Sequence, residues 1–196
     1  GAGAGGRAES MVCDLADPPA AERVIPEAID RLEGVDVLVN NAGTARWRDL
    51  DDVPDEDWYA AFELNVMTPM RLMRAAIPGM RERGWGRIVN VCSTAGKRPS
   101  AAMAEYSVAK AAELSLSRLF ADRHASAGVL INAVCPGPVK SELWMDEGGL
   151  LDQSKEHGGH ESRDEALDAA GAKRPIGRLA EVDEVAATIA FLCSEH

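Results

Sequence analysis

Short apolar runs alternate along this chain with much longer stretches in which apolar residues recur every three to four positions. The short runs are residues 11–15, 35–39, 87–92 and 129–135, and the long stretches are residues 18–33, 55–83, 104–125 and 181–194. A short, β-branched, largely apolar run is typical of a strand in a buried parallel sheet, whereas a period near 3.6 is typical of a helix. Parallel strands that alternate with helices are joined by right-handed crossovers, so this order predicts an α/β fold with a doubly wound parallel sheet.

The helical stretches carry further expectations about packing. In residues 18–33 the predicted apolar face consists of Val24, Ile25, Ala28, Ile29 and Leu32. Pro69 and Pro78 are each expected to kink the stretch 55–83 or to end a segment of it. In the last helix, the residues expected to be buried are Val185, Ile189 and Leu192.

Composition restricts the class of protein. The chain has 196 residues, of which 46% are hydrophobic and 27% charged, as expected for one soluble globular domain. No apolar run approaches the roughly 20 residues that span a bilayer, and the Gly/Ala-rich start does not look like a signal peptide, so a cytoplasmic location without membrane contact is expected. The formal net charge of −11 argues against a nucleic-acid surface, which needs clustered lysine and arginine.

No metal site is expected. The four cysteines contain no C-x-x-C pair, and buried reduced thiols are the interpretation that fits Cys92 and Cys135, which end apolar runs. His157 and His160 flank two glycines in a polar stretch, and no further ligand stands at a useful spacing from them.

Polar and glycine residues stand at or just after the ends of the predicted strands. Asp14 ends the first strand, the NNAG of residues 40–43 follows the second, Ser93 the third, and Pro136–Gly137 the fourth. In sheets of this kind a ligand binds outside the carboxyl ends of the strands. We therefore expect the functional site to be assembled from these four segments.

Tyr106 and Lys110 are four residues apart and share one face of a helix. Taken alone, such a pair is most often a surface tyrosine above a surface lysine. An ammonium near a phenol favours the phenolate, which otherwise forms near pH 10, so the pair could exchange a proton with a carbonyl or alcohol oxygen. Ser93 could offer its hydroxyl to the same oxygen. No histidine follows a strand and no serine lies in a G-x-S-x-G turn, which argues against a Ser-His-Asp hydrolase.

Taken in order, these motifs resemble the compact single-domain branch of the short-chain dehydrogenase/reductase family, which has a Rossmann-like fold. The matching features are CDLAD with Asp14, NNAG at 40–43, Asn65, Ser93 after GRIVNV, YSVAK at 106–110, PG at 136–137 and RPIGRLAEVDEVA at 174–186. The resemblance implies an NAD(P)-dependent oxidoreductase that interconverts a ketone and a secondary alcohol, with spacings similar to those of 3-oxoacyl-acyl-carrier-protein reductases. It also implies a small carbonyl or alcohol substrate and a homodimer or homotetramer.

The resemblance carries the family roles onto individual residues. Tyr106 would be the acid/base, Lys110 would promote its ionisation and hold the nicotinamide ribose, Ser93 would orient the substrate, and Asn65 would keep a water in a proton relay. The residues that would bind the cofactor are Asp14, Leu15, Asn41, Ala42, Gly43, Tyr106, Lys110, Pro136, Gly137, Val139 and Ser141. Of these, Asp14 and Leu15 would contact adenine, residues 41–43 would border the ribose and pyrophosphate, and residues 136–139 would border the nicotinamide, with Ser141 near its phosphate or amide.

The chain departs from the family pattern at both ends. Residues 1–10 (GAGAGGRAES) are interpreted as a glycine-rich remnant or tag, because a βαβ unit needs about 30 residues. The first βαβ unit and the last strand are therefore expected to be missing from the single domain of residues 11–196, which predicts weak cofactor binding and an exposed sheet edge. The choice between NAD and NADP is made after the absent second strand, so the sequence favours neither.

Two alternatives remain beside an active reductase. One is a catalytically inactive fragment that serves as an oligomerisation or binding module. The other is an epimerase or dehydratase of the extended branch, which is disfavoured because the large C-terminal substrate domain is absent. The segment 139–175 is predicted to be a substrate-loop insertion, in which Leu143, Trp144, Met145, Leu150 and Leu151 either line an apolar pocket or pack the insertion onto the domain.

Overall fold

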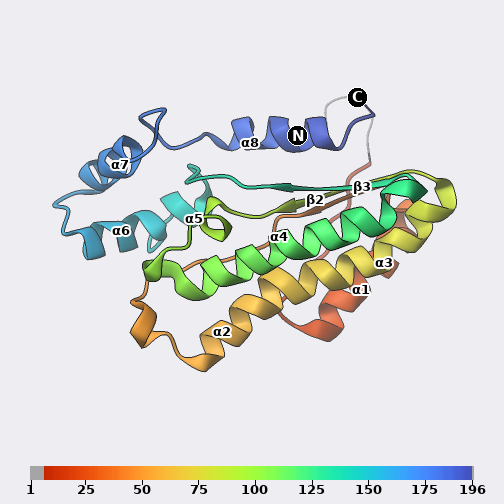
Figure 1. The fold of residues 1–196 in the computed structure, drawn as a ribbon, viewed down its shortest axis with the longest axis horizontal. Helices are drawn as coiled ribbons and strands as arrows, with labels where there is room; N and C mark the ends of the chain where they lie inside the picture. Colours follow the sequence, from red (N-terminus) through yellow and green to blue (C-terminus); the bar gives the residue numbers. More distant parts are fainter. Residues whose placement is uncertain (1–6, 196) are drawn as a thin grey trace.

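The computed structural model describes residues 7–195, so residues 1–6 of the glycine-rich segment lie outside the described residues. Its centre is a parallel sheet of three strands, β1 (Val37–Asn40), β2 (Gly86–Val91) and β3 (Val129–Val134), which lie side by side in that order. Val39 lies opposite Val89, which in turn lies opposite Asn132. The predicted α/β class with parallel strands joined by helices is confirmed (Figure 1).

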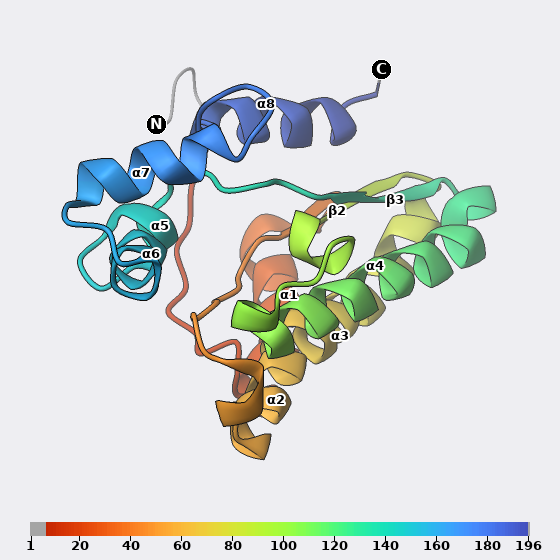
Figure 2. The same ribbon diagram turned by 60° about the vertical axis from the view of Figure 1, so that its left-hand side comes forward.

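Three helices cover one face of the sheet: α1 (Pro18–Leu32), α3 (Thr68–Arg83) and α4 (Ala104–His124) (Figure 2). The core between them and the sheet contains Ile25, Leu72, Met73, Ala76, Ile77, Met80, Ile88, Val129 and Ile131. The apolar face predicted for α1 is only partly buried, because Ile29 and Leu32 are exposed. α1 packs chiefly on α3, so the far side of its apolar face remains uncovered.

The prediction of a strand at residues 11–15 was wrong. This segment runs as extended chain into the turn before α1, and Val12 is fully exposed. Within residues 7–195 no strand pairs with it. A strand needs a neighbouring strand for its backbone hydrogen bonds, and the apolar pattern of this segment does not indicate whether such a neighbour exists.

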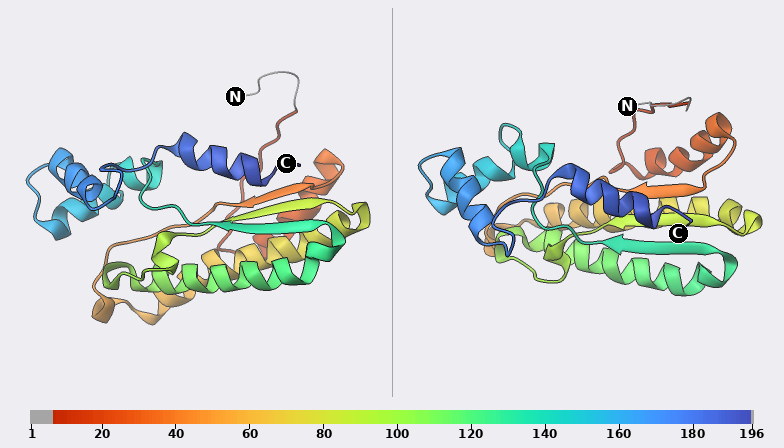
Figure 3. Two further views of the ribbon diagram at one scale, coloured as in Figure 1. Left: turned by 45° about the horizontal axis from the view of Figure 1, so that its top comes forward. Right: turned by 90° about the horizontal axis from the view of Figure 1, so that it is seen from above.

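α8 (Val182–Leu192) lies across the other face of the sheet, over β2 and β3 (Figure 3). Its start is fixed by a capping box between Glu181 and Glu184. The prediction that Val185, Ile189 and Leu192 are buried was wrong, since all three are only partly buried. One helix cannot cover a whole sheet face, so Val37, Val39 and Leu130 on the same face are also exposed.

The long helix predicted at 55–83 is present but irregular. α2 (Asp55–Phe62) passes into a π-helical turn at Glu63–Met67 and then into α3. Pro69 lies in the first turn of α3, directly after the π-helical turn, and Pro78 lies inside α3. The irregularity therefore precedes Pro69 and surrounds Asn65.

The segment 139–175 contains three helices: α5 (Glu142–Met145), α6 (Leu150–Gly158) and α7 (Arg163–Ala172). Its two ends meet, because Lys140 N donates to Ala180 O at 2.9 Å and Ala180 N donates to Pro138 O at 3.1 Å. Leu150 and Leu151 are buried, whereas Leu143 is exposed. Of the five apolar residues predicted either to line a pocket or to pack the insertion onto the domain, the two leucines of α6 are thus packing residues.

No helix among residues 7–195 combines the length and the apolar character needed to cross a membrane.

A substitution at Gly128 tests whether the turn before β3 requires glycine. Its φ is +81°, and a Cβ there would lie 1.9 Å from Gly84 O, whereas Gly148 has φ +73° with no atom within 4 Å of such a Cβ. We expect Gly148→Ala to lower the free energy of unfolding by about 1 kcal/mol, the cost of a left-handed alanine. Gly128→Ala should lower it by more than about 3 kcal/mol, because the backbone clash is added. Denaturant unfolding followed by tryptophan fluorescence measures both, and equal losses would contradict this account.

Candidate active site

The predicted strand-end segments meet at one edge of the sheet. The register continues past β2, where Cys92 N donates to Val134 O at 2.8 Å and Thr94 N donates to Pro136 O at 2.9 Å. These bonds place Ser93 beside the Pro136–Gly137 loop. Asn41–Gly43 leaves β1 at the same edge, because all three strands are parallel.

α4 carries Tyr106 and Lys110 to this edge. The turn after Ser93 lies directly on the helix, since a Cβ at Gly96 would lie 2.8 Å from the backbone carbonyl of Lys110. Only glycine permits so close an approach. Tyr106 is half-buried, and the Nζ of Lys110 lies 5.8 Å from the centre of its ring. The two residues therefore share one face of the helix, as their spacing predicts.

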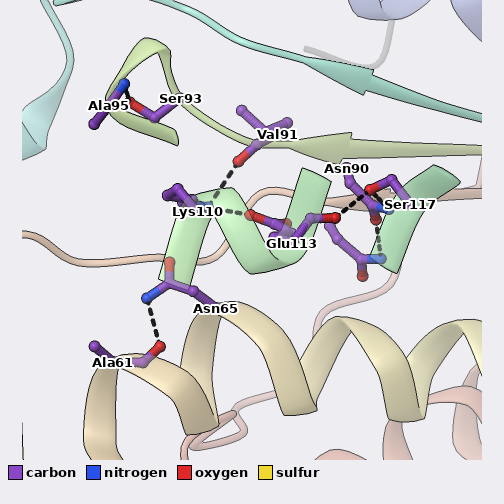
Figure 4. Close-up of polar contacts among 10 residues, drawn as sticks. Ala61, Asn65, Asn90, Val91, Ser93, Ala95, Lys110, Glu113 and Ser117 are labelled. Atoms are coloured by element: carbon purple, nitrogen blue, oxygen red, sulfur yellow. Dashed lines mark hydrogen bonds and ion pairs between the residues drawn. The ribbon is translucent and has the colours of Figure 1, made fainter. Parts of the chain in front are cut away.

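Lys110 is buried, with 3% of its surface exposed. Its Nζ donates to Val91 O at 2.9 Å and to Glu113 Oε2 at 2.8 Å (Figure 4). An ammonium has three donors, so one remains for another partner. The surface-lysine alternative is therefore wrong for Lys110.

Asn65 is also buried, in the π-helical turn. Its Nδ2 donates to Ala61 O at 2.9 Å, and its Oδ1 has no hydrogen-bond partner among residues 7–195 (Figure 4). A Cβ at Gly43 would lie 3.1 Å from this Oδ1 and 3.7 Å from Lys110 Nζ. Asn65, Lys110 and the NNAG turn thus converge, and a buried acceptor without a partner is left between them for a water or a ligand.

Ser93 joins the site from the end of β2. Its Oγ accepts a hydrogen bond from Ala95 N at 3.1 Å and so caps the short turn Thr94–Gly96. The hydroxyl hydrogen is not used in this bond, so Ser93 can cap the turn and still donate to a substrate oxygen.

Asn90 and Ser117, to which no sequence motif assigned a role, position the site together with Asn40 of the NNAG motif. Asn40 Nδ2 donates to Asn90 Oδ1 at 2.7 Å, and Asn90 Nδ2 donates to Ser117 Oγ at 2.8 Å. Ser117 Oγ donates in turn to the backbone oxygen of Glu113 at 2.7 Å. The sequence signal was an asparagine within a buried strand and a polar residue on the inward face of α4.

The residues predicted to contact adenine are tied to α3. Thr68 Oγ1 donates to Leu15 O at 2.6 Å, and Asp14 Oδ1 accepts from Ala16 N at 2.9 Å. Asp14 is exposed. Thr68 follows Asn65 by one helical turn, so this segment reaches the same helix as the site, although its hydrogen bonds do not lead to the strand ends.

The remaining cofactor-binding predictions fall after β3. Val139 forms an isolated bridge with Ala180, and Ser141 directly precedes α5, so both stand at the base of the 139–175 insertion. A Cβ at Gly137 would meet no atom within 4 Å, and Gly137 therefore borders open space. Gly43, Gly137 and the unpartnered Asn65 oxygen are features that fit the nicotinamide-ribose half of a dinucleotide.

The described residues contain no metal site, and a cavity beside α1 is separate from the candidate active site. Within residues 7–195, no three His, Cys, Asp or Glu side chains are arranged to hold a metal ion. A cavity between Ser10–Cys13 and α1 is lined by Arg23, Glu27 and Arg31 and includes none of the predicted site residues.

The family model described as short chain dehydrogenase matches residues 2–149. The chain belongs to the short-chain dehydrogenase/reductase family. The 3-oxoacyl-(acyl-carrier-protein) reductase FabG of Vibrio cholerae is 34% identical over 190 residues, which cover 97% of this chain and 72% of that protein. The D-beta-hydroxybutyrate dehydrogenase of Cupriavidus necator is 33% identical over 99% of this chain and 74% of its own length.

Solved structures agree with this assignment. The L-sorbose reductase from Gluconobacter frateurii complexed with NADPH and L-sorbose superposes with a TM-score of 0.83 at 32% identity, covering 93% of this chain and 68% of that one. A gluconate 5-dehydrogenase from Beutenbergia cavernae, described as putative and carrying bound NADP, gives 0.82 at 30% identity, covering 97% and 71%. This short-chain dehydrogenase/reductase is thus an oxidoreductase that uses NAD or NADP.

Gly43 tests whether the converging residues hold the cofactor. Gly43→Ala puts a methyl group against Asn65 Oδ1 and Lys110 Nζ. We expect the Kd of NADH or NADPH, followed by nicotinamide fluorescence, to rise at least ~10-fold, equivalent to about 1.4 kcal/mol. Gly34→Ala, before the start of β1, is the control and should bind as the parent does, because a Cβ there would meet only the Arg83 side chain at 3.7 Å. Unchanged affinity in Gly43→Ala would place the cofactor elsewhere.

Proposed function

We propose that this protein interconverts a ketone and a secondary alcohol, with Tyr106 as the acid/base. The observation that carries the proposal is the buried ammonium of Lys110 beside the Tyr106 ring, at the edge where the Ser93, NNAG and Pro136–Gly137 segments meet. A phenol next to a desolvated ammonium can release and recover a proton.

The bound nicotinamide cofactor supplies or accepts the hydride. In ketone reduction, Tyr106 donates its hydroxyl proton to the substrate oxygen, and Ser93 donates a hydrogen bond to that oxygen. The Lys110 ammonium stabilises the phenolate left on Tyr106. The free Oδ1 of Asn65 accepts a hydrogen bond from a water, through which a proton returns to Tyr106 by way of Lys110. Alcohol oxidation runs through the same groups in reverse.

The cofactor-binding assignment is proposed in three parts. Asp14 and Leu15 contact adenine, and Asn41, Ala42 and Gly43 border the ribose and pyrophosphate. Pro136, Gly137, Val139 and Ser141 border the nicotinamide end, while Lys110 holds its ribose. The sheet edge shared by residues 41–43 and 136–137 and the open space at Gly137 support the ribose and nicotinamide parts of this assignment.

We also propose a substrate class and a lid. The relatives include reductases of 3-oxoacyl thioesters and a hydroxybutyrate dehydrogenase, which points to a small β-oxo or β-hydroxy acyl substrate. The insertion 139–175 rises from the nicotinamide side of the site and forms the lid, with Leu143 as an exposed apolar contact.

Tyr106→Phe tests the acid/base assignment. The variant loses only a hydroxyl, so it should fold as the parent does and lose at least ~10²-fold in kcat, the scale of positioned acid/base groups. Tyr59→Phe is the matched control, because Tyr59 is the only other tyrosine and is 73% exposed on α2. Ketone-dependent oxidation of NADPH and NADH measures both. Activity of Tyr106→Phe within a few fold of the control would overturn the proposed role.

Self-association through α2–α3 and α4 is the second proposal. These helices present Tyr59, Met67, Val108 and Leu119 as exposed apolar side chains, and Leu119 is 66% exposed. A shared apolar surface of this kind favours a dimer or tetramer. We expect light scattering at tens of micromolar to show an oligomer that Leu119→Glu dissociates. A monomeric parent would contradict the proposal.

A further inference from the structure

Glu113 is the most deeply buried charged residue beside the site, with 1% of its surface exposed. It stands three residues after Lys110 on α4, and its Oε2 lies 2.8 Å from Lys110 Nζ (Figure 4). The roles assigned above make no use of it. A buried carboxylate is strongly destabilising unless it is paired, so Glu113 and Lys110 depend on each other.

We propose that Glu113 is a positioning residue that fixes the Lys110 ammonium and offsets part of its charge, so that it sets the pH at which Tyr106 gives up its proton. The proposal rests on the acid/base role of Tyr106 proposed above. It concerns a balance of three groups, in which Lys110 favours the phenolate and Glu113 opposes that effect.

Geometry supports the positioning part. The Lys110 side chain is flexible in general, but here two of its three donors are anchored by Val91 O and Glu113 Oε2. The backbone of Glu113 is itself held by Ser117 Oγ, which is bonded to Asn90 of β2. The carboxylate therefore sits on a rigid support, and the ammonium is held between the Tyr106 ring and the NNAG turn.

Few titratable groups act on Glu113, and the other buried carboxylate of α4, Glu105, directly precedes Tyr106 and is the same in every variant compared. The titratable groups that act on Glu113 are Lys110 and Cys92, and Cys135 acts on Cys92. Burial raises the pKa of the Cys92 thiol, so it stays neutral and adds no charge. Burial also raises the pKa of the Glu113 carboxyl, and Lys110 opposes that shift. The Lys110 ammonium is thus paired with one carboxylate, which offsets part of its charge.

The test reads Tyr106 directly, without turnover. Because Tyr59 is the only other tyrosine, Tyr59→Phe leaves Tyr106 as the single phenol. Its ionisation is then followed by phenolate absorbance against pH in the parent Tyr59→Phe protein, with circular dichroism as the check on folding. We expect Glu113→Gln to lower the midpoint by about one pH unit, because the ammonium then acts unopposed. Glu113→Asp keeps the charge and should restore the midpoint to within about half a unit.

A folded Glu113→Gln protein with an unchanged midpoint would overturn the proposal and leave Glu113 a structural counter-ion. If Glu113→Gln does not fold, Lys110→Met with Glu113→Leu removes both charges together, a change that buried pairs often tolerate. The double variant should raise the midpoint by less than about one unit, because Glu113 already offsets part of the effect of the ammonium in the parent. A rise of more than about one unit would show that Lys110 acts unopposed and would also overturn the proposal. Failure of Tyr106→Phe to affect turnover is a separate result, which concerns the proposed function alone.

Discussion

A buried line of hydrogen bonds holds the site together. It runs from Asn40 in β1 through Asn90 in β2 and Ser117 in α4 to the backbone of Glu113. Polar groups inside a core are stable only when they are paired, and this pairing admits one position of α4 against the sheet. Tyr106 and Lys110 lie at the start of the same helix, so their place at the strand ends follows from that line.

The sequence predicted well those features that depend on local pattern and on parallel topology. Once β1, β2 and β3 are parallel, their carboxyl ends must meet, and the NNAG, Ser93 and Pro136–Gly137 segments are found there. Elements that depend on a distant partner were predicted poorly. Residues 11–15 were predicted to form a strand, but no strand within residues 7–195 pairs with them. α8 was predicted to be a buried helix, but it lies on a sheet face that it covers only in part.

Glu113 shows why buried polar residues near the site are difficult to predict from the sequence pattern. A glutamate on a long helix is normally a solvated surface residue, and only the fold reveals that its turn faces β2. The available signal was its position three residues after Lys110, on the face that also carries Ser117. The helices of the 139–175 insertion were missed for a related reason, because their buried residues are few and their polar residues hide the period.

The single ammonium of Lys110 links the features that surround it. Val91 O and Glu113 take two of its donors, while Gly43 and the unpartnered Asn65 oxygen lie on the side of the NNAG turn. Under the proposed roles, a change at Glu113 would alter where the ammonium sits as well as how strongly its charge acts. A change at Gly43 would alter which group can reach the remaining donor. The contributions of these residues are therefore coupled rather than additive, since each acts through the same charge. In the proposed mechanism, the proton chemistry of Tyr106 and the binding of the cofactor ribose would share one buried cation.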